Sequence, residues 1–376
     1  MKKLFGDMAM GKGPRIARIG VRAFDLPLAQ PLHVGGRTLE RRLGLLVVVE
    51  DGEGHAGIGE TAPLPGLHRE TIDEAEEQLL AVAGRLERAR IPEGCPRLDD
   101  AFETWLGGLG LHPSVRTGIE GAVLTLLADR AGTDPPHLLA PTPAAQVRVN
   151  GLLDGEPAVI LERAVRLAAA GYTALKIKVG RREPRDEAHL VTSVRALVKP
   201  SVALRLDANR AWELAVARDF AGITAPAGIE YLEEPLHDPG DLADFAAHSP
   251  VPVALDETLL EFSPRSPPPL RGVAALILKT SVLGGYERAM AWARLARRER
   301  RAAVASATFP SAVGMALDAA LAAAIGHETA HGLGTSAAFA EDLGRAPLAV
   351  EGGCIDVRKL PFRPSEFKLE RTRVLR

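Results

Sequence analysis

Residues 202–207 read VALRLD, an apolar run that ends on a carboxylate. Three similar runs follow along the chain: IEYLE at 229–233 and VALD at 253–256 also end on a carboxylate, and ALILK at 275–279 ends on a lysine. Short apolar runs that alternate with helical stretches predict parallel strands joined by helical crossovers. Each charge would then close a strand at the carboxyl edge of one sheet, where barrel enzymes keep their chemistry.

The same alternation extends over residues 146–336. The expected strands are Arg148–Gly151, Ala174–Val179, Val202–Asp207, Gly228–Glu233, Val251–Asp256, Ala274–Lys279, Ala302–Ser306 and an eighth around His331–Gly334. The expected helices include Glu156–Ala170, Glu187–Leu197, Leu214–Ala221 and Tyr286–Arg297. Such a series fits a (β/α) barrel, which takes about 200 to 250 residues. An open doubly wound sheet is the alternative, but no Gly-x-Gly-x-x-Gly loop follows a strand in this region.

The first part of the chain, residues 14–145, predicts an α+β unit behind a tail at residues 1–13. The expected elements are strands at Ala17–Leu26, Arg42–Glu50 and His55–Glu60, followed by helices at Ile72–Ala89 and Ser114–Arg130. Strands followed by helices, without alternation, are typical of α+β domains. Thr71 and Glu74 have the spacing of a capping box at the start of the first helix.

The composition narrows the class of protein. Lys and Arg number 46 and Asp and Glu number 48, which lacks the basic excess of a nucleic-acid-binding protein. Only Cys95 and Cys354 are present, so a disulfide framework is excluded and a reducing compartment is favoured. The start of the chain lacks the apolar core of a signal peptide, and the Ala-rich stretch Ala312–Ile325 is too short to span a bilayer. We expect a soluble cytoplasmic protein that binds neither nucleic acid nor membrane.

The carboxylates Asp207, Glu233 and Asp256 close three successive predicted strands. A single acidic residue at this position often only caps the next helix. Three converging carboxylates would repel one another unless a cation joined them, and oxygen ligands suit Mg²⁺, with Mn²⁺ as an alternative. Strand alternation cannot decide whether Glu233 or its neighbour Glu234 is the ligand.

Lys176 and Lys178 alternate on one strand and therefore project to the same face. Two neighbouring ammonium groups lower each other's pKa, so we expect one of them to act as a base, although two exposed lysines on an edge strand is the simpler alternative. Lys279 closes a strand on the other side of the carboxylates. Lysines on both faces of a metal-held carboxylate substrate could form and quench an enediolate.

These motifs resemble the enolase superfamily in its muconate-lactonizing-enzyme subgroup. The matching segments are Lys176-Ile177-Lys178, Leu206-Asp207-Ala208-Asn209, Leu232-Glu233-Glu234-Pro235, Leu255-Asp256-Glu257 and Leu278-Lys279. The resemblance implies a (β/α)₇β barrel at residues 146–336 under an N-terminal capping domain at 14–145, with a C-terminal segment at 337–376 that returns to the capping domain. It also implies that Glu233, rather than Glu234, binds the metal.

Within the superfamily the sequence is most similar to o-succinylbenzoate synthases. The likeness lies in Gly59–Gly66 with Glu70-Thr71, in Arg205–Trp212 and in Gly332–Thr335. It implies Mg²⁺-dependent dehydration of 2-succinyl-6-hydroxy-2,4-cyclohexadiene-1-carboxylate to o-succinylbenzoate. The substrate is a small-molecule carboxylate, and the reaction is a step of menaquinone biosynthesis. Lys178 would be the base and then the acid, Lys279 would stabilise the enediolate and Lys176 would assist. Substrate contacts are expected from Asn209, Ser306, Ser311, Pro65 and Gly66. Residues 59–67 are expected to form a lid over the site. The sequence does not decide whether the chain forms a homo-oligomer.

Other activities compete with this one. N-succinylamino acid racemases and dipeptide epimerases use the same metal and lysines, but an epimerase would carry an Asp-x-Asp pair that residues 332–336 lack. Thr280-Ser281 and Pro310 depart from the synthase pattern at positions that would border the substrate. A Schiff-base aldolase could use Lys279 as its nucleophile. Arg41 or Arg42 could meet a substrate carboxylate or lie on the surface.

Overall fold

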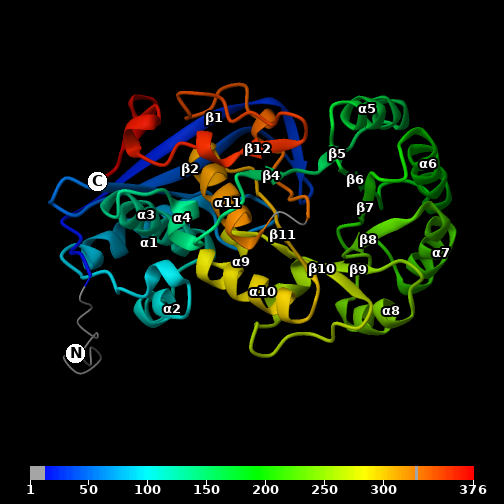
Figure 1. Cartoon of the computed structure of the whole chain (residues 1–376), viewed down its shortest axis with the longest axis horizontal. Helices are drawn as coiled ribbons and strands as arrows, with labels where there is room; N and C mark the ends of the chain where they lie inside the picture. The colour runs from blue at the N-terminus through cyan, green and yellow to red at the C-terminus, as the bar shows by residue number, and fades with distance from the viewer. Residues whose placement is uncertain (1–12, 327–328) are drawn as a thin grey trace.

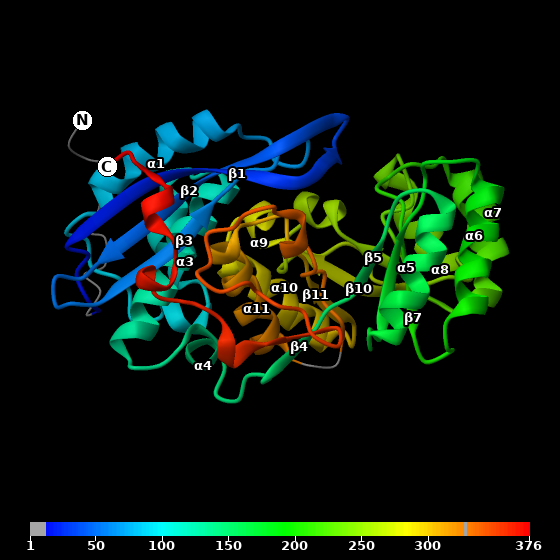
Figure 2. The same cartoon turned by 90° about the horizontal axis from the view of Figure 1, so that it is seen from above.

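The computed structural model describes residues 13–326 and 329–376, so the expected tail lies outside the described residues except for Gly13. An antiparallel four-stranded sheet lies beside a parallel seven-stranded sheet (Figure 1). The first sheet has the order β13-β1-β2-β3 and contains β1 (Arg18–Val34), β2 (Arg37–Glu50), β3 (Ala56–Thr61) and β13 (Arg373–Val374). Seen from above, this sheet and helices α5 to α8 lie at opposite ends of the molecule (Figure 2).

The antiparallel sheet carries two long helices, α1 (Ile72–Leu86) and α3 (Pro113–Arg130). β3 lies directly against α3: a Cβ atom at Gly59 would come within 2.1 Å of the Gly118 carbonyl oxygen, so only glycine fits there. The capping box at the start of α1 is present, as expected. The expected end of α1 at Ala89 is wrong, because Arg88 has a φ of 69° and the Ala89 carbonyl accepts a hydrogen bond from Ile16.

The parallel sheet follows the order of the chain from β5 to β11. Its strands are β5 (Gly151–Leu153), β6 (Ala174–Lys178), β7 (Ala203–Asp207), β8 (Ile229–Glu233), β9 (Val253–Leu255), β10 (Val273–Leu278) and β11 (Ala302–Ala305). The helices between and after them are α5 (Pro157–Ala169), α6 (Pro184–Leu197), α7 (Leu214–Thr224), α8 (Leu242–His248), α9 (Thr280–Leu283), α10 (Tyr286–Arg298) and α11 (Ala312–Ile325). Alternating strands and helices are therefore confirmed.

The expected first strand, Arg148–Gly151, is wrong in its bounds. The structure has β4 (Gln146–Arg148) paired antiparallel with β12 (Cys354–Asp356), and the parallel sheet begins only at Gly151. Val147 of β4 is buried together with Ile355 of β12, whereas Gln146 and Arg148 are exposed. Because residues 146–148 pair with β12, they do not belong to the parallel sheet.

The expected eighth strand is reduced to His331 and Gly332, which link the two edges of the parallel sheet. His331 exchanges backbone hydrogen bonds with Arg148 and Asn150, just before β5, and Gly332 does so with Ala305 and Ala307, at the end of β11. The buried His331 ring accepts a hydrogen bond from the Ala305 amide at Nδ1, and burial lowers its pKa to about 4. The open-sheet alternative is therefore excluded.

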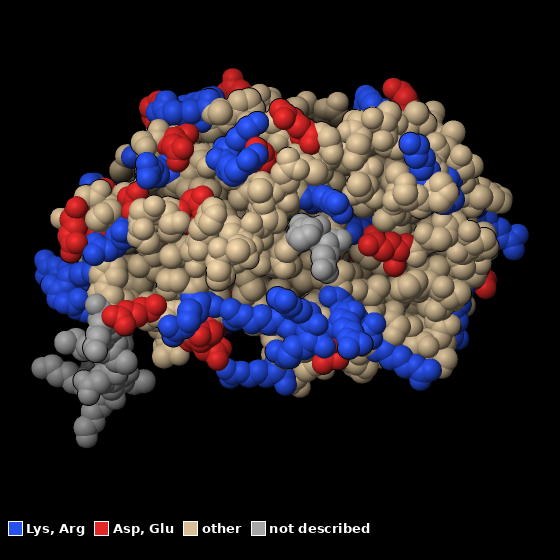
Figure 3. All heavy atoms as spheres, viewed as in Figure 1, with Lys and Arg blue, Asp and Glu red and all other residues tan. Residues whose placement is uncertain are grey.

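The C-terminal segment returns to the antiparallel sheet, where β13 pairs with β1 (Figure 1). Phe339, Leu343 and Phe367 of this segment pack with Phe24 and Leu26 of β1. Among the described residues, no helix is long and apolar enough to cross a membrane. Acidic and basic side chains are both scattered over the face drawn in Figure 3, and several basic ones gather along its lower edge.

Candidate active site

The ends of three neighbouring strands bring the predicted site residues to one level. Lys178 of β6 is in register with Asp207 of β7, and Asp207 is in register with Glu233 of β8. Lys176 lies two residues before Lys178 and so projects to the same face. The carboxylates are almost fully buried, with exposed fractions of 1 % for Asp207 and Glu233 and 5 % for Asp256.

The lysines and carboxylates form two groups of ion pairs. Lys176 Nζ lies 2.8 Å from Asp207 Oδ2 and 2.7 Å from Glu233 Oε1. Lys178 Nζ donates to the same Asp207 oxygen at 2.7 Å and to Asn209 Oδ1 at 2.8 Å. On the far side Lys279 pairs with Asp256. The structure thus brings together all three lysines and all three carboxylates that the sequence singled out.

The expectation that paired lysines lower each other's pKa is wrong for Lys176. Burial does lower the pKa of Lys176, but the charges of Asp207 and Glu233 outweigh burial and raise it well above its ordinary value. For Lys279, burial is likewise outweighed by Asp256, and the pKa is raised. In this arrangement each of these two ammonium groups therefore serves first as a counter-ion.

The donor set fits a divalent cation. Glu233 Oε2 is buried and has no hydrogen-bond partner in the described part of the chain, and burial together with the charge of Asp207 raises the pKa of this carboxyl. An additional cation would satisfy that oxygen, and an all-carboxylate set suits Mg²⁺. Among residues 13–326 and 329–376, no three acidic, His or Cys side chains are already arranged around a metal position, since the carboxylates turn to the lysines instead. A metal would have to compete with those lysines.

Glu234 is directed away from the lysines, which separates the two neighbouring glutamates. Its carboxylate accepts hydrogen bonds from the backbone amides of Asp256 and Thr258, both at 2.8 Å, and pairs with Arg210 at 3.0 Å. Its φ of 38° turns the chain at the end of β8. Glu234 therefore holds the backbone of Asp256 in place, and Glu233 alone of the two faces the lysines.

Comparisons with known proteins show the family of this chain. Residues 159–361, more than half of the chain, match the family described as "Enolase C-terminal domain-like". The chain belongs to the enolase superfamily. Residues 17–98 match "MenC, N-terminal domain". The o-succinylbenzoate synthase of Citrobacter koseri is 31 % identical over 84 % of this chain and 89 % of its own, and that of Yersinia pseudotuberculosis is 29 % identical over 83 % and 88 %.

Two further similarities concern a longer protein and the fold. The PHYLLO protein of Arabidopsis thaliana is 32 % identical over 80 % of this chain, which spans only 20 % of PHYLLO. The muconate lactonizing enzyme of Pseudomonas fluorescens superposes with a TM-score of 0.81 at 20 % identity, covering 96 % of this chain and 98 % of that one. At that identity the likeness shows the fold alone. The family match and these relatives show that this superfamily member is an enzyme of the hydro-lyase type. It is similar to o-succinylbenzoate synthase.

Non-glycine residues of this superfamily member adopt left-handed backbone conformations at three strand ends. They are Asn209 and Arg210 after β7, Glu234 after β8 and Phe309 after β11, with φ between 38° and 60°. Such conformations cost about 1–3 kcal/mol each and cluster at functional sites. Their positions agree with a site at the carboxyl edge of the barrel.

The residues predicted to contact the substrate lie in different surroundings. Asn209 holds Lys178, and Ser306 pairs with Gly332 in the strand that closes the barrel. Ser311 is fully buried at the start of α11, and its hydroxyl donates to Glu60 at 2.5 Å, so a direct substrate contact would require that bond to break. Pro65 and the exposed Gly66 lie in the segment 59–67, called the capping loop below, and their contact with substrate stays a prediction.

Both expectations for Arg42 are wrong. Its side chain is only 1 % exposed and donates to the carbonyl oxygens of Phe309 at 3.0 Å and of Pro63 at 2.9 Å, among others. Burial lowers its pKa to about 10. Arg42 therefore ties the capping loop to the segment after β11, whereas Arg41 is exposed and pairs with Asp25 at 2.7 Å.

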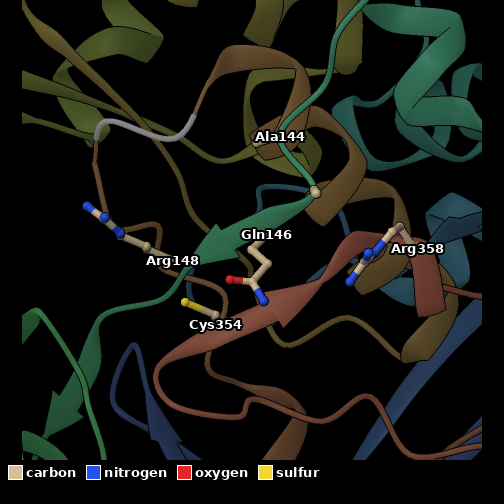
Figure 4. Close-up of a pocket in the computed structure, with 6 residues that line it drawn as sticks. Ala144, Gln146, Arg148, Cys354 and Arg358 are labelled. Carbon is tan, nitrogen blue, oxygen red and sulfur yellow. The ribbon is translucent and has the colours of Figure 1, made fainter.

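A separate pocket of about 390 Å³ is lined by residues of β4, of β12 and of the segments next to these strands (Figure 4). Gln146, Arg148, Cys354 and Arg358 line it, and none of its lining residues belongs to the lysine and carboxylate set. No pattern in the sequence predicted this pocket.

Proposed function

We propose that the chain dehydrates 2-succinyl-6-hydroxy-2,4-cyclohexadiene-1-carboxylate to o-succinylbenzoate in the menaquinone pathway of the cytoplasm. The observation that carries the proposal is the placement of Lys176 and Lys178 on one side, and Lys279 on the other, of three buried carboxylates. The similarity to o-succinylbenzoate synthases over most of their length supports this particular substrate.

We assign proton transfer to Lys178. Asp207 and Asn209 hold its amine, and its side chain is 20 % exposed, more than that of either other lysine. In the proposed reaction it removes the proton from the ring carbon that bears the carboxylate, and it returns that proton to the departing hydroxide, which leaves as water. The ring becomes aromatic, so the enzyme chiefly has to stabilise the enediolate.

Lys279 and Lys176 have supporting roles in this scheme. Lys279 stabilises the negative charge of the enediolate from the opposite side. Lys176 holds Asp207 and Glu233 at fixed positions. A Mg²⁺ ion bound by Asp207, Glu233 and Asp256 would supply positive charge next to the substrate carboxylate. The pairing of Lys279 with Asp256 argues against a Schiff-base aldolase, because that amine would have to be neutral and free to attack.

A racemase of N-succinylamino acids is the second candidate, since amines on both sides of one carbon can also exchange its proton between faces. The test measures both activities on the same preparation. With Mg²⁺ we expect synthase turnover that EDTA abolishes and added Mg²⁺ restores. A folded, Mg²⁺-loaded protein that racemises N-succinylamino acids without any synthase activity would overturn the assignment.

A further inference from the structure

His68 connects the end of the capping loop to the barrel. Its Nδ1 atom lies 2.9 Å from the backbone nitrogen of Leu64, and its Nε2 atom lies 3.1 Å from Oγ of Ser281. Ser281 Oγ in turn lies 2.8 Å from Oγ1 of Thr308. Ser281 stands two residues beyond Lys279, and Thr308 follows β11, the strand next to β10. The contacts therefore run from the loop to the ends of two neighbouring barrel strands.

The direction of the first two hydrogen bonds is fixed by chemistry. The backbone N–H of Leu64 can only donate, so Nδ1 of His68 must be an unprotonated acceptor. The neutral imidazole then carries its proton on Nε2 and donates it to Ser281. Burial lowers the pKa of His68 to about 4 despite the opposing charge of Glu70, which keeps the ring neutral near pH 7.

The hydroxyl groups of Ser281 and Thr308 have two protons, and their hydrogen bonds to each other and to His68 require only one of them. Ser281 accepts from His68, and the contact between Ser281 and Thr308 uses one hydroxyl proton whichever group donates it. In the described part of the chain, the second hydroxyl proton has no further hydrogen-bond acceptor. The pair therefore offers one donor near the end of β10, where Lys279 stands.

We propose that His68 is a positioning residue that keeps Ser281 and Thr308 together as a net hydrogen-bond donor toward an acceptor oxygen of the substrate. Because Leu64 belongs to the capping loop, this donor is set only while the loop is seated on the barrel. The acceptor is a carboxylate oxygen of the succinyl arm, and to that extent the inference rests on the proposed function. Any N-succinylated substrate would present similar oxygens.

Two substitutions of nearly equal shape separate polarity from packing. In His68→Gln, the amide oxygen can accept from Leu64 and the amide nitrogen can donate to Ser281, which keeps the free hydroxyl proton. In His68→Glu, studied at a pH that ionises the carboxyl group, the carboxylate accepts from both, so Ser281 donates to it, Thr308 donates to Ser281 and no donor is left.

We expect His68→Glu to raise KM about tenfold to a hundredfold with little change in kcat, because a lost hydrogen bond to a charged group weakens binding by that order. His68→Gln should stay within about threefold of the parent, since the donor is kept. Equal KM values for the two variants would overturn the proposal. The control is the same substitution in a Ser281→Ala, Thr308→Val protein, which has no hydroxyl group for His68 to orient. There His68→Glu should not raise KM further. A further increase would contradict the proposal.

Nitrogen NMR of the His68 ring in the substrate-free protein tests the same point without any reaction. We expect the tautomer protonated at Nε2, and a ring protonated at Nδ1 would contradict the proposal. This readout is independent of the substrate: missing synthase activity would refute the proposed function and leave the tautomer as it is. If the protein proves to be a racemase, the same KM comparison is made with N-succinylamino acids.

Discussion

Lys176→Met removes a cation that lies between two buried carboxylates. Its Nζ atom is 2.8 Å from Asp207 and 2.7 Å from Glu233, whose side chains are 2 % and 1 % exposed. Leaving one member of a buried ion pair uncompensated costs about 3–5 kcal/mol. Asp207 keeps Lys178 as a partner at 2.7 Å, so the loss should fall near about 3 kcal/mol, the lower end of that range.

Mg²⁺ should reverse most of this loss. If Asp207 and Glu233 are metal ligands, a bound cation replaces the charge that the substitution removed, and Mg²⁺ should bind the variant more tightly because Lys176 no longer competes for the same oxygens. Binding to the folded state alone then adds stability in proportion to the logarithm of free Mg²⁺ over its Kd.

Urea unfolding in EDTA and in saturating Mg²⁺ measures both effects. The variant should be destabilised by about 3 kcal/mol in EDTA and by less than about 1 kcal/mol in Mg²⁺. Lys359→Met serves as the control, because Lys359 is exposed and should show no difference between the two conditions. Equal losses for Lys176→Met with and without Mg²⁺ would refute the reasoning.

Three further predictions concern Lys178, the two neighbouring glutamates and the buried Asp318. Lys178→Ala should abolish turnover without weakening Mg²⁺ binding, measured by calorimetry, because Lys178 pairs with Asp207 and can only compete with the metal; residual turnover above about a hundredth of the parent would rule out Lys178 as the base. Glu233→Gln should weaken Mg²⁺ binding directly, whereas Glu234→Gln should chiefly lower the free energy of unfolding, by about 1–3 kcal/mol, and the reverse pattern would contradict the assignment of the two glutamates. Burial raises the pKa of Asp318 to about 7 despite its hydrogen bond from Thr280. The folded state therefore binds this proton more tightly than the unfolded state, and stability declines as pH rises from about 4 to 7; Asp318→Asn should flatten that decline in pH-dependent unfolding, and an unchanged slope would contradict it.

Much of the barrel follows from local rules. Apolar runs with charges at their ends predicted β7, β8, β9 and β10, because each is short, buried on both faces and followed by a helix or turn. The period of two placed Lys176 and Lys178 on one face without any knowledge of the partners. The seventh and last strand, β11, was equally visible as an apolar run.

Other features depend on contacts between distant residues. Glu233 and Glu234 differ in role because Glu234 bonds the amides of Asp256 and Thr258, and no local pattern reveals that. The pairing of β4 with β12 depends on a partner some two hundred residues away. Arg42 looks like an ordinary surface residue in the sequence, and its burial arises only when the capping loop meets the segment after β11.

The same limit applies to His68. Its neighbours in the sequence give no indication that its ring joins Leu64 to Ser281 and Thr308, since those contacts cross between the capping domain and the barrel. Likewise, the pKa of Lys176 could not be foreseen from the neighbouring lysine alone. The charges that decide it, Asp207 and Glu233, lie on the two following strands.

Calorimetric titration of Mg²⁺ into the parent protein and into Asp256→Asn tests the carboxylate site most directly. We predict one Mg²⁺ per chain in the parent and at least tenfold weaker binding in the variant, because one of three carboxylate ligands is neutralised. The variant should remain folded, which its circular dichroism spectrum checks. An unchanged titration in folded Asp256→Asn would contradict the proposed ligand set.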